Sequence, residues 1–282
     1  MTDQIRIGAV SYLNALPLVH GIEAGLGSDR IRLSHAAPSV LADQMERGEL
    51  DVALLPVIEL ARHPNNELVP GLGIVTRGPS RSVLLLHRRP LAQATSVALD
   101  RDSRTSNALT QLLFAAVWKA SPRFEIGSPD LEEALESHDA VLRIGDKALF
   151  DPVPKGVSVT DLGGVWTEST GRPFVFAAWI ARPGVVDREL YRTLHESRRR
   201  GSRAIDEIAR AFRYRGGAYP DAARDYLTHN IHFRLGSVEL DAMESFYRAA
   251  AGLDLIEAVP RIRWVFERRT EYHERAEQAA RP

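Results

Sequence analysis

The sequence contains no cysteine. This absence excludes disulfide bonds, thiolate nucleophiles and cysteine-ligated metal sites. The sequence also has no uninterrupted apolar run of about 18 residues, so we expect no helix that spans a membrane. Its first residues show no basic region followed by an apolar core, which is the pattern of a secretory signal, and we therefore expect a cytoplasmic protein.

No single sign of charge predominates. The 36 basic residues nearly cancel the 37 acidic residues. Proteins that bind nucleic acid or membrane surfaces usually carry a clear basic excess, so we expect neither kind of partner. The Arg-rich segment 187–212 does not change this expectation, because acidic and apolar residues interrupt it and predict a helix with one solvated face.

The short motifs of several common sites are also missing. The sequence has no Gly-x-Gly-x-x-Gly after a strand, no phosphate loop ending in Gly-Lys-Ser/Thr and no Gly-x-Ser-x-Gly. His229 and His232 are spaced like a pair of metal ligands, but no motif supplies the third and fourth ligands of a stable site. We therefore expect no bound metal.

Apolar runs typical of strands alternate along the sequence with segments of helical period. Strands are predicted at 5–10, 31–35, 51–55 and 72–76, with helices between the first three. The order strand–helix–strand–helix–strand predicts an α/β fold with a mostly parallel sheet that is covered by helices on both faces.

Two long apolar runs, 82–87 and 173–181, enclose a further series of small strand–helix units. This arrangement predicts an inserted lobe that two crossovers join to the rest of the chain, with a ligand cleft between the lobes. We expect lobe I to comprise residues 1–87 and 180–282, and lobe II to comprise residues 88–179.

Polar residues mark two junctions at which a strand leads into a helix. Ser103-Arg104-Thr105-Ser106 precedes a helix whose first-turn amides could bind a carboxylate or phosphate, or one hydroxyl could simply cap that helix. Asn14 precedes a helix whose first turn suits Pro17. Asn14 is either the cap of that helix or a ligand contact at the carboxyl end of the first strand, and the residues alone leave both readings open.

Five stretches resemble the menaquinone biosynthesis enzymes of the futalosine route, the MqnA/MqnD family. They follow one another along the sequence at 7–18, 48–56, 103–106, 144–149 and 161–177. The first reads Ile-Gly-x-Val-Ser-Tyr-Leu-Asn-x-x-Pro-Leu, and the C-terminal helices carry little of the resemblance. It implies a two-lobed fold like the type II periplasmic binding proteins, each lobe a mostly parallel sheet flanked by helices.

The family has two branches. One is chorismate dehydratase, which converts chorismate to 3-[(1-carboxyvinyl)oxy]benzoate and water without a metal or organic cofactor. The other, 1,4-dihydroxy-6-naphthoate synthase, uses a histidine base in the motif that reads Ile144-Gly145-Asp146 here. Glycine cannot transfer a proton, so the resemblance implies the dehydratase, a carbon–oxygen lyase. The synthase and a non-catalytic cytosolic anion-binding protein stay as alternatives.

The resemblance also implies the residues of the site. Asn14 and Ser82 match the catalytic positions, although Ser82 could instead be a strand-start serine that faces water. An amide has no titrating group near neutral pH, so Asn14 would hold the departing hydroxyl or the ether. The proton would pass to a carboxylate of the substrate or to Asp146. The expected substrate contacts, among which two hydroxyls hold one carboxylate (Thr105 and Ser106), are Leu13, Ser103, Arg104, Thr105, Ser106, Gly145, Asp146 and Thr170.

Overall fold

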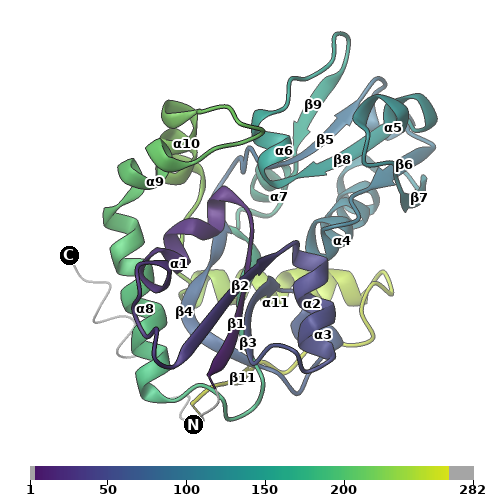
Figure 1. Cartoon of the computed structure of the whole chain (residues 1–282). Helices are drawn as coiled ribbons and strands as arrows, with labels where there is room; N and C mark the ends of the chain where they lie inside the picture. Colours follow the sequence, from purple (N-terminus) through teal and green to yellow (C-terminus); the bar gives the residue numbers. More distant parts are fainter. Residues whose placement is uncertain (1–3, 267–282) are drawn as a thin grey trace.

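One six-stranded sheet forms the base of the first lobe in the computed structural model, which describes residues 4–266. Its strand order is β11–β4–β10–β3–β1–β2 (Figure 1). The strands are β1 (Ile5–Val10), β2 (Ile31–Ala36), β3 (Val52–Pro56), β4 (Glu67–Thr76), β10 (Phe174–Ala181) and β11 (Arg263–Trp264). The central strand β3 is buried at every position, as expected for a continuous apolar strand that is covered on both faces.

The second lobe contains a five-stranded sheet in the order β7–β6–β8–β5–β9. Its strands are β5 (Val83–His87), β6 (Ser96–Leu99), β7 (Arg123–Ile126), β8 (Ala140–Ile144) and β9 (Ser158–Asp161). Its helices are α4 (Arg104–Leu113), which a wider turn at Phe114–Trp118 prolongs, α5 (Leu131–Ser137), α6 (Gly145–Phe150) and α7 (Leu162–Thr170).

Both sheets are mixed, whereas the sequence predicted mostly parallel ones. β1 pairs in parallel with β2 and β3, but β10 runs antiparallel to β3 and β4. In the second sheet β5 runs antiparallel to β8 and β9. The chain reaches β5 and β10 from the other lobe, without a strand–helix–strand crossover inside one sheet. Such right-handed crossovers make neighbouring strands parallel, so these two strands can run antiparallel to their neighbours.

The chain changes sheets earlier than the predicted lobe boundaries. β5 belongs to the second sheet and β10 to the first, so the crossovers fall between β4 and β5 and between β9 and β10. The apolar runs predicted both strands correctly, but two strands of similar apolar character do not reveal which sheet each one joins. The predicted lobe boundaries at 88 and 180 therefore move to the segments before β5 and before β10. Residues 267–282 of the predicted lobe I lie outside the described residues.

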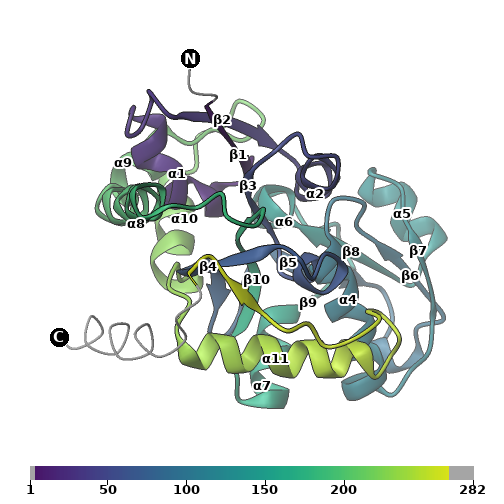
Figure 2. The same ribbon diagram turned by 90° about the horizontal axis from the view of Figure 1, so that it is seen from below.

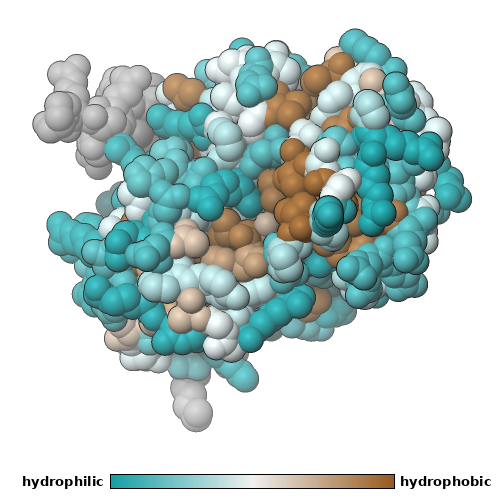
Figure 3. Space-filling model, turned by 90° about the horizontal axis from the view of Figure 1, so that it is seen from above, coloured by the Kyte–Doolittle hydropathy of each residue, from teal (hydrophilic) through white to brown (hydrophobic). Residues whose placement is uncertain are grey.

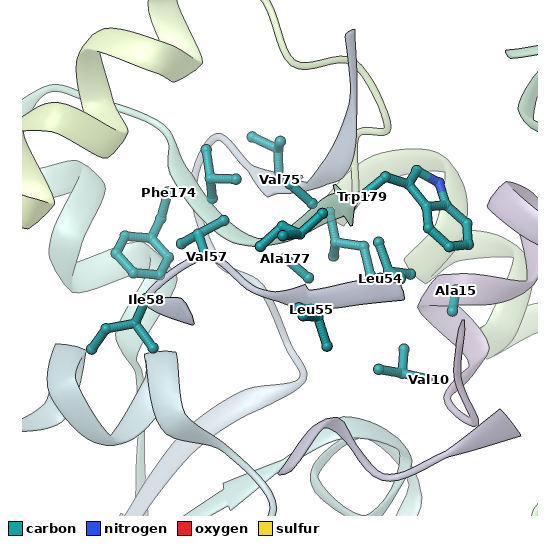
Figure 4. Close-up of a cluster of buried hydrophobic side chains, with 14 of the residues drawn as sticks. Val10, Ala15, Leu54, Leu55, Val57, Ile58, Val75, Phe174, Ala177 and Trp179 are labelled. Atoms are coloured by element: carbon teal, nitrogen blue, oxygen red, sulfur yellow. The ribbon is translucent and has the colours of Figure 1, made fainter. Parts of the chain in front are cut away.

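A continuous apolar core lies beneath β3, β4 and β10. Leu54 in β3 pairs across the sheet with Trp179 in β10, and both side chains are buried (Figure 4). Burial of such side chains contributes about 1.5–3 kcal/mol each. The same core reaches Leu85 in β5, so the two lobes pack against each other and share apolar contacts.

Two closely packed helices fix the part of the first lobe that follows Asn14. These are α1 (Leu16–Glu23) and α8 (Arg188–Arg203), which pack closely. A Cβ atom at Gly201 would lie 2.0 Å from the carbonyl oxygen of Pro17, so only glycine permits this approach. The Ser197 hydroxyl accepts the Gly21 N–H over 3.0 Å and donates to the Leu18 carbonyl over 2.9 Å, which fixes α1 just after Asn14.

The remaining α-helices pack on the sheets or on other helices. They are α2 (Pro38–Glu46), α3 (Glu59–Arg62), α9 (Ile205–Ala211), α10 (Pro220–Asp225) and α11 (Ser237–Ala251). The single helix predicted over 187–212 is divided at Ala204 into α8 and α9. α11 contacts both β10 and α4 and thus runs beneath both lobes (Figure 2).

The face shown in Figure 3 is mainly hydrophilic, with apolar residues gathered in a few patches. Some exposed apolar surface is ordinary for a globular protein. Within residues 4–266 no helix is both long enough and apolar enough to cross a membrane.

Candidate active site

A pocket with about 510 Å³ of empty space, its opening to solvent included, lies where the two lobes meet. Its polar wall comes from the turn after β1, the start of β5 and the start of α4, namely Tyr12, Asn14, Ser82, Ser103, Thr105, Ser106 and Gly145. Its apolar wall is Val10, Pro38, Pro56, Ile74, Val83, Ile144, Phe176 and Ala177. Six of the predicted site residues thus meet at one pocket, although they come from widely separated parts of the sequence.

The start of α4 presents hydroxyls to the pocket. Ser103 caps the helix, because its Oγ accepts the Ser106 N–H over 3.2 Å. The capping interpretation is therefore confirmed for Ser103. Thr105 Oγ1 accepts the N–H of Ile58 over 3.3 Å, which joins α4 to the first lobe. No described residue bonds the Ser106 hydroxyl, so this group is left to interact with a ligand.

Arg104 lies at the same helix start but does not line the pocket. Its guanidinium pairs with Asp43 and with Glu59, the latter over 3.0 Å. Glu59 is fully buried, and burial raises the pKa of its carboxyl while the charge of Arg104 opposes that rise. A buried carboxylate needs such a partner. The predicted substrate contact is corrected accordingly, because Arg104 joins α4 to α2 and α3.

Asn14 is not a helix cap. It lies within the short turn Leu13–Ala15, and the cap position of α1 falls on Ala15, which makes no side-chain cap bond. The Asn14 amide Nδ2 donates to the hydroxyl of Tyr226 over 3.2 Å. Its Oδ1 is buried and has no hydrogen-bond partner within residues 4–266. Of the two readings of Asn14, the helix cap is therefore wrong, and the ligand contact stays a prediction.

Ser82 lies on the pocket wall just before β5 and is only 3% exposed. The interpretation that it faces water is therefore wrong. Its Oγ accepts a hydrogen bond of 2.7 Å from the Tyr226 hydroxyl. Ser82 is thus linked through Tyr226 to Asn14.

Sequence reasoning missed Tyr226. It follows α10, in a region that carries little of the family resemblance, and its burial raises the pKa of its phenol well above the usual value. The apolar residues Ala223 and Leu227, which share helical spacing with Tyr226, could have predicted a buried ring. Nothing in that spacing reveals that its hydroxyl contacts Ser82 and Asn14, which precede it by 144 and 212 positions in the sequence.

Gly145 and Asp146 begin α6 beside the pocket. The Gly145 N–H donates to the Ser82 carbonyl over 2.8 Å, and its φ is +66°. Its neighbour turns away from the pocket, because the Asp146 carboxylate accepts the N–H of Leu13 over 3.0 Å. Neither Leu13 nor Asp146 lines the pocket, so these two predicted contacts act on the site from behind. Burial raises the pKa of Asp146 to about 6.

The structure does not bring Thr170 to the pocket. This residue is exposed near the end of α7, and its hydroxyl donates to the Trp166 carbonyl over 2.7 Å. Trp166 itself is buried and donates to the Pro173 carbonyl over 2.9 Å. The position of Thr170 therefore does not match the predicted substrate contact.

None of the described residues that line the pocket carries a formal charge. An anionic ligand would consequently be met by hydroxyls and by the first-turn amides of α4, whose helix dipole favours negative charge. Residues 4–266 contain no group of three or more His, Asp or Glu side chains placed to hold a metal ion. Of the two histidines noted in the sequence, His229 bonds instead to Asp225 over 2.9 Å.

Comparison with known proteins identifies the family of this chain. A family model described as menaquinone biosynthesis matches residues 5–252. The chain belongs to this family. The chorismate dehydratase of Thermus thermophilus is 31% identical to it over 261 residues, which cover 86% of this chain and 94% of the relative. The chorismate dehydratase of Campylobacter jejuni is 27% identical over 245 residues, covering 86% and 92%. Because these relatives of the menaquinone biosynthesis family are enzymes, the pocket is a candidate active site.

Solved structures define the fold. A protein from Archaeoglobus fulgidus superimposes with a TM-score of 0.73 at 18% identity, over 90% of this chain and 99% of that protein. The periplasmic aliphatic sulphonate binding protein of Escherichia coli superimposes with a TM-score of 0.59 at 16% identity, over 96% of each chain. The predicted two-lobed fold like that of the periplasmic binding proteins is thereby confirmed for this member of the menaquinone biosynthesis family.

Proposed function

We propose that the chain is a chorismate dehydratase, a hydro-lyase that converts chorismate to 3-[(1-carboxyvinyl)oxy]benzoate and water. The observation that carries this proposal is the meeting of Asn14 and Ser82 at one pocket, on either side of the Tyr226 hydroxyl. The two chorismate dehydratases described above support it. We also propose a cytoplasmic location, which cell fractionation tests.

The reaction places modest demands on a protein. Chorismate carries two carboxylates, a ring hydroxyl and, on the carbon that bears the enolpyruvyl ether, a ring proton. Loss of that proton and of the neighbouring hydroxyl as water leaves an aromatic ring, so the reaction is strongly downhill. The enzyme chiefly needs to orient these groups, prevent rearrangement and assist one proton transfer.

The start of α4 is suited to hold one carboxylate. Ser106 offers a hydroxyl without a described partner, and the Thr105 hydroxyl lies beside it on the pocket wall. The first-turn amides add hydrogen-bond donors and a favourable dipole. Since no lining residue is cationic, carboxylate binding here depends on hydrogen bonds instead of an ion pair.

Asn14 and Ser82 are suited to the departing hydroxyl. An amide and a serine hydroxyl do not titrate near neutral pH, so they act by hydrogen bonding and leave proton removal to another group. A carboxylate of the substrate itself serves as the base in this proposal. Asp146 is less suited to that task, because its carboxylate accepts the Leu13 N–H and does not line the pocket.

Gly145 favours the dehydratase over the naphthoate synthase. A Cβ atom at this position would lie 3.0 Å from the ring of Tyr12, closer than side chains normally pack. The positive φ of Gly145 is a second obstacle to a larger residue. A histidine base at this position would therefore require Tyr12 to move.

The test is to mix the purified protein with chorismate, without added metal or cofactor, and to separate the products by chromatography. We expect 3-[(1-carboxyvinyl)oxy]benzoate to form, and we expect the Asn14→Ala variant to lose this activity. Binding of chorismate without turnover would favour the anion-binding protein. A protein that neither binds nor converts chorismate would return the naphthoate synthase to consideration.

A further inference from the structure

The hydroxyl of Tyr226 lies between the two residues to which the proposed function assigns catalysis. It accepts a hydrogen bond from Asn14 Nδ2 over 3.2 Å and donates one to Ser82 Oγ over 2.7 Å. Asn14 belongs to the first lobe, and Ser82 lies where the chain enters the second. One side chain from the C-terminal helices therefore connects two separately anchored parts of the pocket.

The ring of Tyr226 is held rigidly. The residue is 1% exposed and belongs to the continuous apolar core. Its backbone carbonyl accepts the N–H of Ile231 over 3.3 Å, and its neighbours Ala223 and Leu227 are also buried. Close packing restricts the ring to one position. Its hydroxyl can therefore hold the side chains of Asn14 and Ser82 in fixed positions through the two hydrogen bonds.

The single phenolic hydrogen determines which atoms of the two partners stay free. Burial keeps the pKa of Tyr226 far above neutrality, so the phenol keeps its proton. Because it donates to Ser82 and accepts from Asn14, the Ser82 hydrogen is left for another acceptor. Asn14 Oδ1 is buried without a partner, which is unfavourable until a donor reaches it.

We propose that Tyr226 is a positioning residue that makes Asn14 and Ser82 act as one unit. It leaves an acceptor on Asn14 and a donor on Ser82, both at the pocket wall. This pair suits a departing hydroxyl: Oδ1 orients it by accepting its hydrogen, and the Ser82 hydrogen stabilises the negative charge that develops on its oxygen. The proton that the substrate carboxylate takes from the ring then completes the water. The inference rests on the proposed function where it is tested by enzyme kinetics. Where it is tested by nuclear magnetic resonance, it rests only on the two hydrogen bonds.

The decisive variant is Tyr226→Phe, which removes the hydroxyl and keeps the ring. We expect kcat with chorismate to fall about 10–100-fold while KM changes less than about threefold, because the loss affects alignment more than binding. The double variant Tyr226→Phe with Ser82→Ala should be no more than about twofold slower than Ser82→Ala alone, since residues that act as a unit are not additive.

Tyr247→Phe is the matched control. Tyr247 is also fully buried, and its hydroxyl donates to the Val57 carbonyl over 2.7 Å, away from Asn14 and Ser82. We expect this variant to lose thermal stability to a similar degree and to keep the kinetics of the wild type. Equal kinetics in the two Phe variants, or multiplying effects of Tyr226→Phe and Ser82→Ala, would overturn the inference.

Nuclear magnetic resonance separates this inference from the proposed function. The side-chain amide signals of Asn14 are identified by their loss in Asn14→Ala. In Tyr226→Phe they should shift and exchange faster with water, whereas in Tyr247→Phe they should stay unchanged. If the wild type does not convert chorismate, the proposed function fails and these signals still decide the inference, with unchanged signals in Tyr226→Phe counting against it.

Discussion

The carboxylate of Asp146 accepts a hydrogen bond of 3.0 Å from the backbone N–H of Leu13. This contact joins α6 of the second lobe to the turn that carries Asn14 in the first. A side chain that does not line the pocket thereby holds the backbone immediately before Asn14, a candidate catalytic residue. Asp146 therefore affects the pocket by holding the turn that carries Asn14. We expect its protonation state to change the stability of the fold more than the rate of the reaction.

Replacement of Asp146 by Asn should leave turnover largely intact. The amide keeps an oxygen that can accept the Leu13 N–H, so we expect kcat at pH 8 to stay within about threefold of the wild type. Asp146→Ala removes the acceptor, and here kcat should fall about tenfold, since an unpaired buried N–H destabilises the turn. Steady-state kinetics with chorismate measure both. Loss of turnover with intact binding in Asp146→Asn would instead identify this carboxyl as the base.

The same carboxyl should make folding stability depend on pH. Its pKa rises from 3.8 to about 6 on folding, because burial disfavours the charged form. As the pH increases from about 4 to 6, the unfolded chain loses this proton first, so the contribution of Asp146 to stability declines and then levels off. Relative to the wild type, Asp146→Asn should therefore gain on the order of 2 kcal/mol between these pH values. Urea unfolding measures the difference, and a constant difference across this range would contradict the prediction.

Ser106→Ala should weaken substrate binding more than turnover. Loss of the Ser106 hydroxyl removes a hydrogen bond to a charged carboxylate, so we expect KM for chorismate to rise about tenfold with kcat within about threefold. Thr105→Ala should act in the same direction and also reduce stability, because Thr105 accepts the N–H of Ile58. Thr110 is a buried control on the same helix that does not line the pocket, so Thr110→Ala should leave KM unchanged. A fall in kcat with constant KM would refute this assignment.

Arg104→Ala should mainly destabilise the protein. It leaves the fully buried Glu59 without its closest cation, which costs about 3–5 kcal/mol. Because burial already raises the pKa of Glu59, the loss should be smaller at pH 5 than at pH 8, since protonation at lower pH removes the unpaired buried charge. The double variant with Glu59→Gln should recover part of the stability. Urea unfolding at the two pH values measures the free energy of unfolding of each variant. A rise in KM for chorismate without loss of stability would instead show that Arg104 contacts the substrate.

Local patterns predicted most of the secondary structure and part of the site. Strand β1 and the start of α4 follow from apolar spacing and from Ser103 as a cap, which are properties of neighbouring residues. The direction of a side chain at a junction is decided by more distant partners. Arg104 turns to Glu59 and Asp146 turns to Leu13, and no periodicity in the sequence carries this information.

The antiparallel placement of β10 and the hydroxyl of Tyr226 show the same limit on a larger scale. β10 reads as a buried apolar strand, but its neighbours β3 and β4 are about a hundred residues or more away along the chain. Tyr226 reaches Ser82 only because the C-terminal helices fold back over the first lobe. Family resemblance suggested Asn14 and Ser82 as candidates without their geometry, whereas the structure supplies the residue that connects them.

Gly145→Ala should show how closely the pocket is built. Its Cβ would meet the Tyr12 ring at 3.0 Å, and the backbone would hold alanine at a φ of +66°. Gly156 is the matched control, because its φ is +77° and a Cβ there meets nothing within 4 Å. Gly156→Ala should cost only the backbone strain of about 1–2 kcal/mol. Gly145→Ala should cost about 1–3 kcal/mol more through overpacking and should also lower kcat, since both Tyr12 and Gly145 line the pocket. Equal losses of stability in the two variants, with unchanged turnover, would mean that Tyr12 moves aside freely and that a side chain at 145 is tolerated.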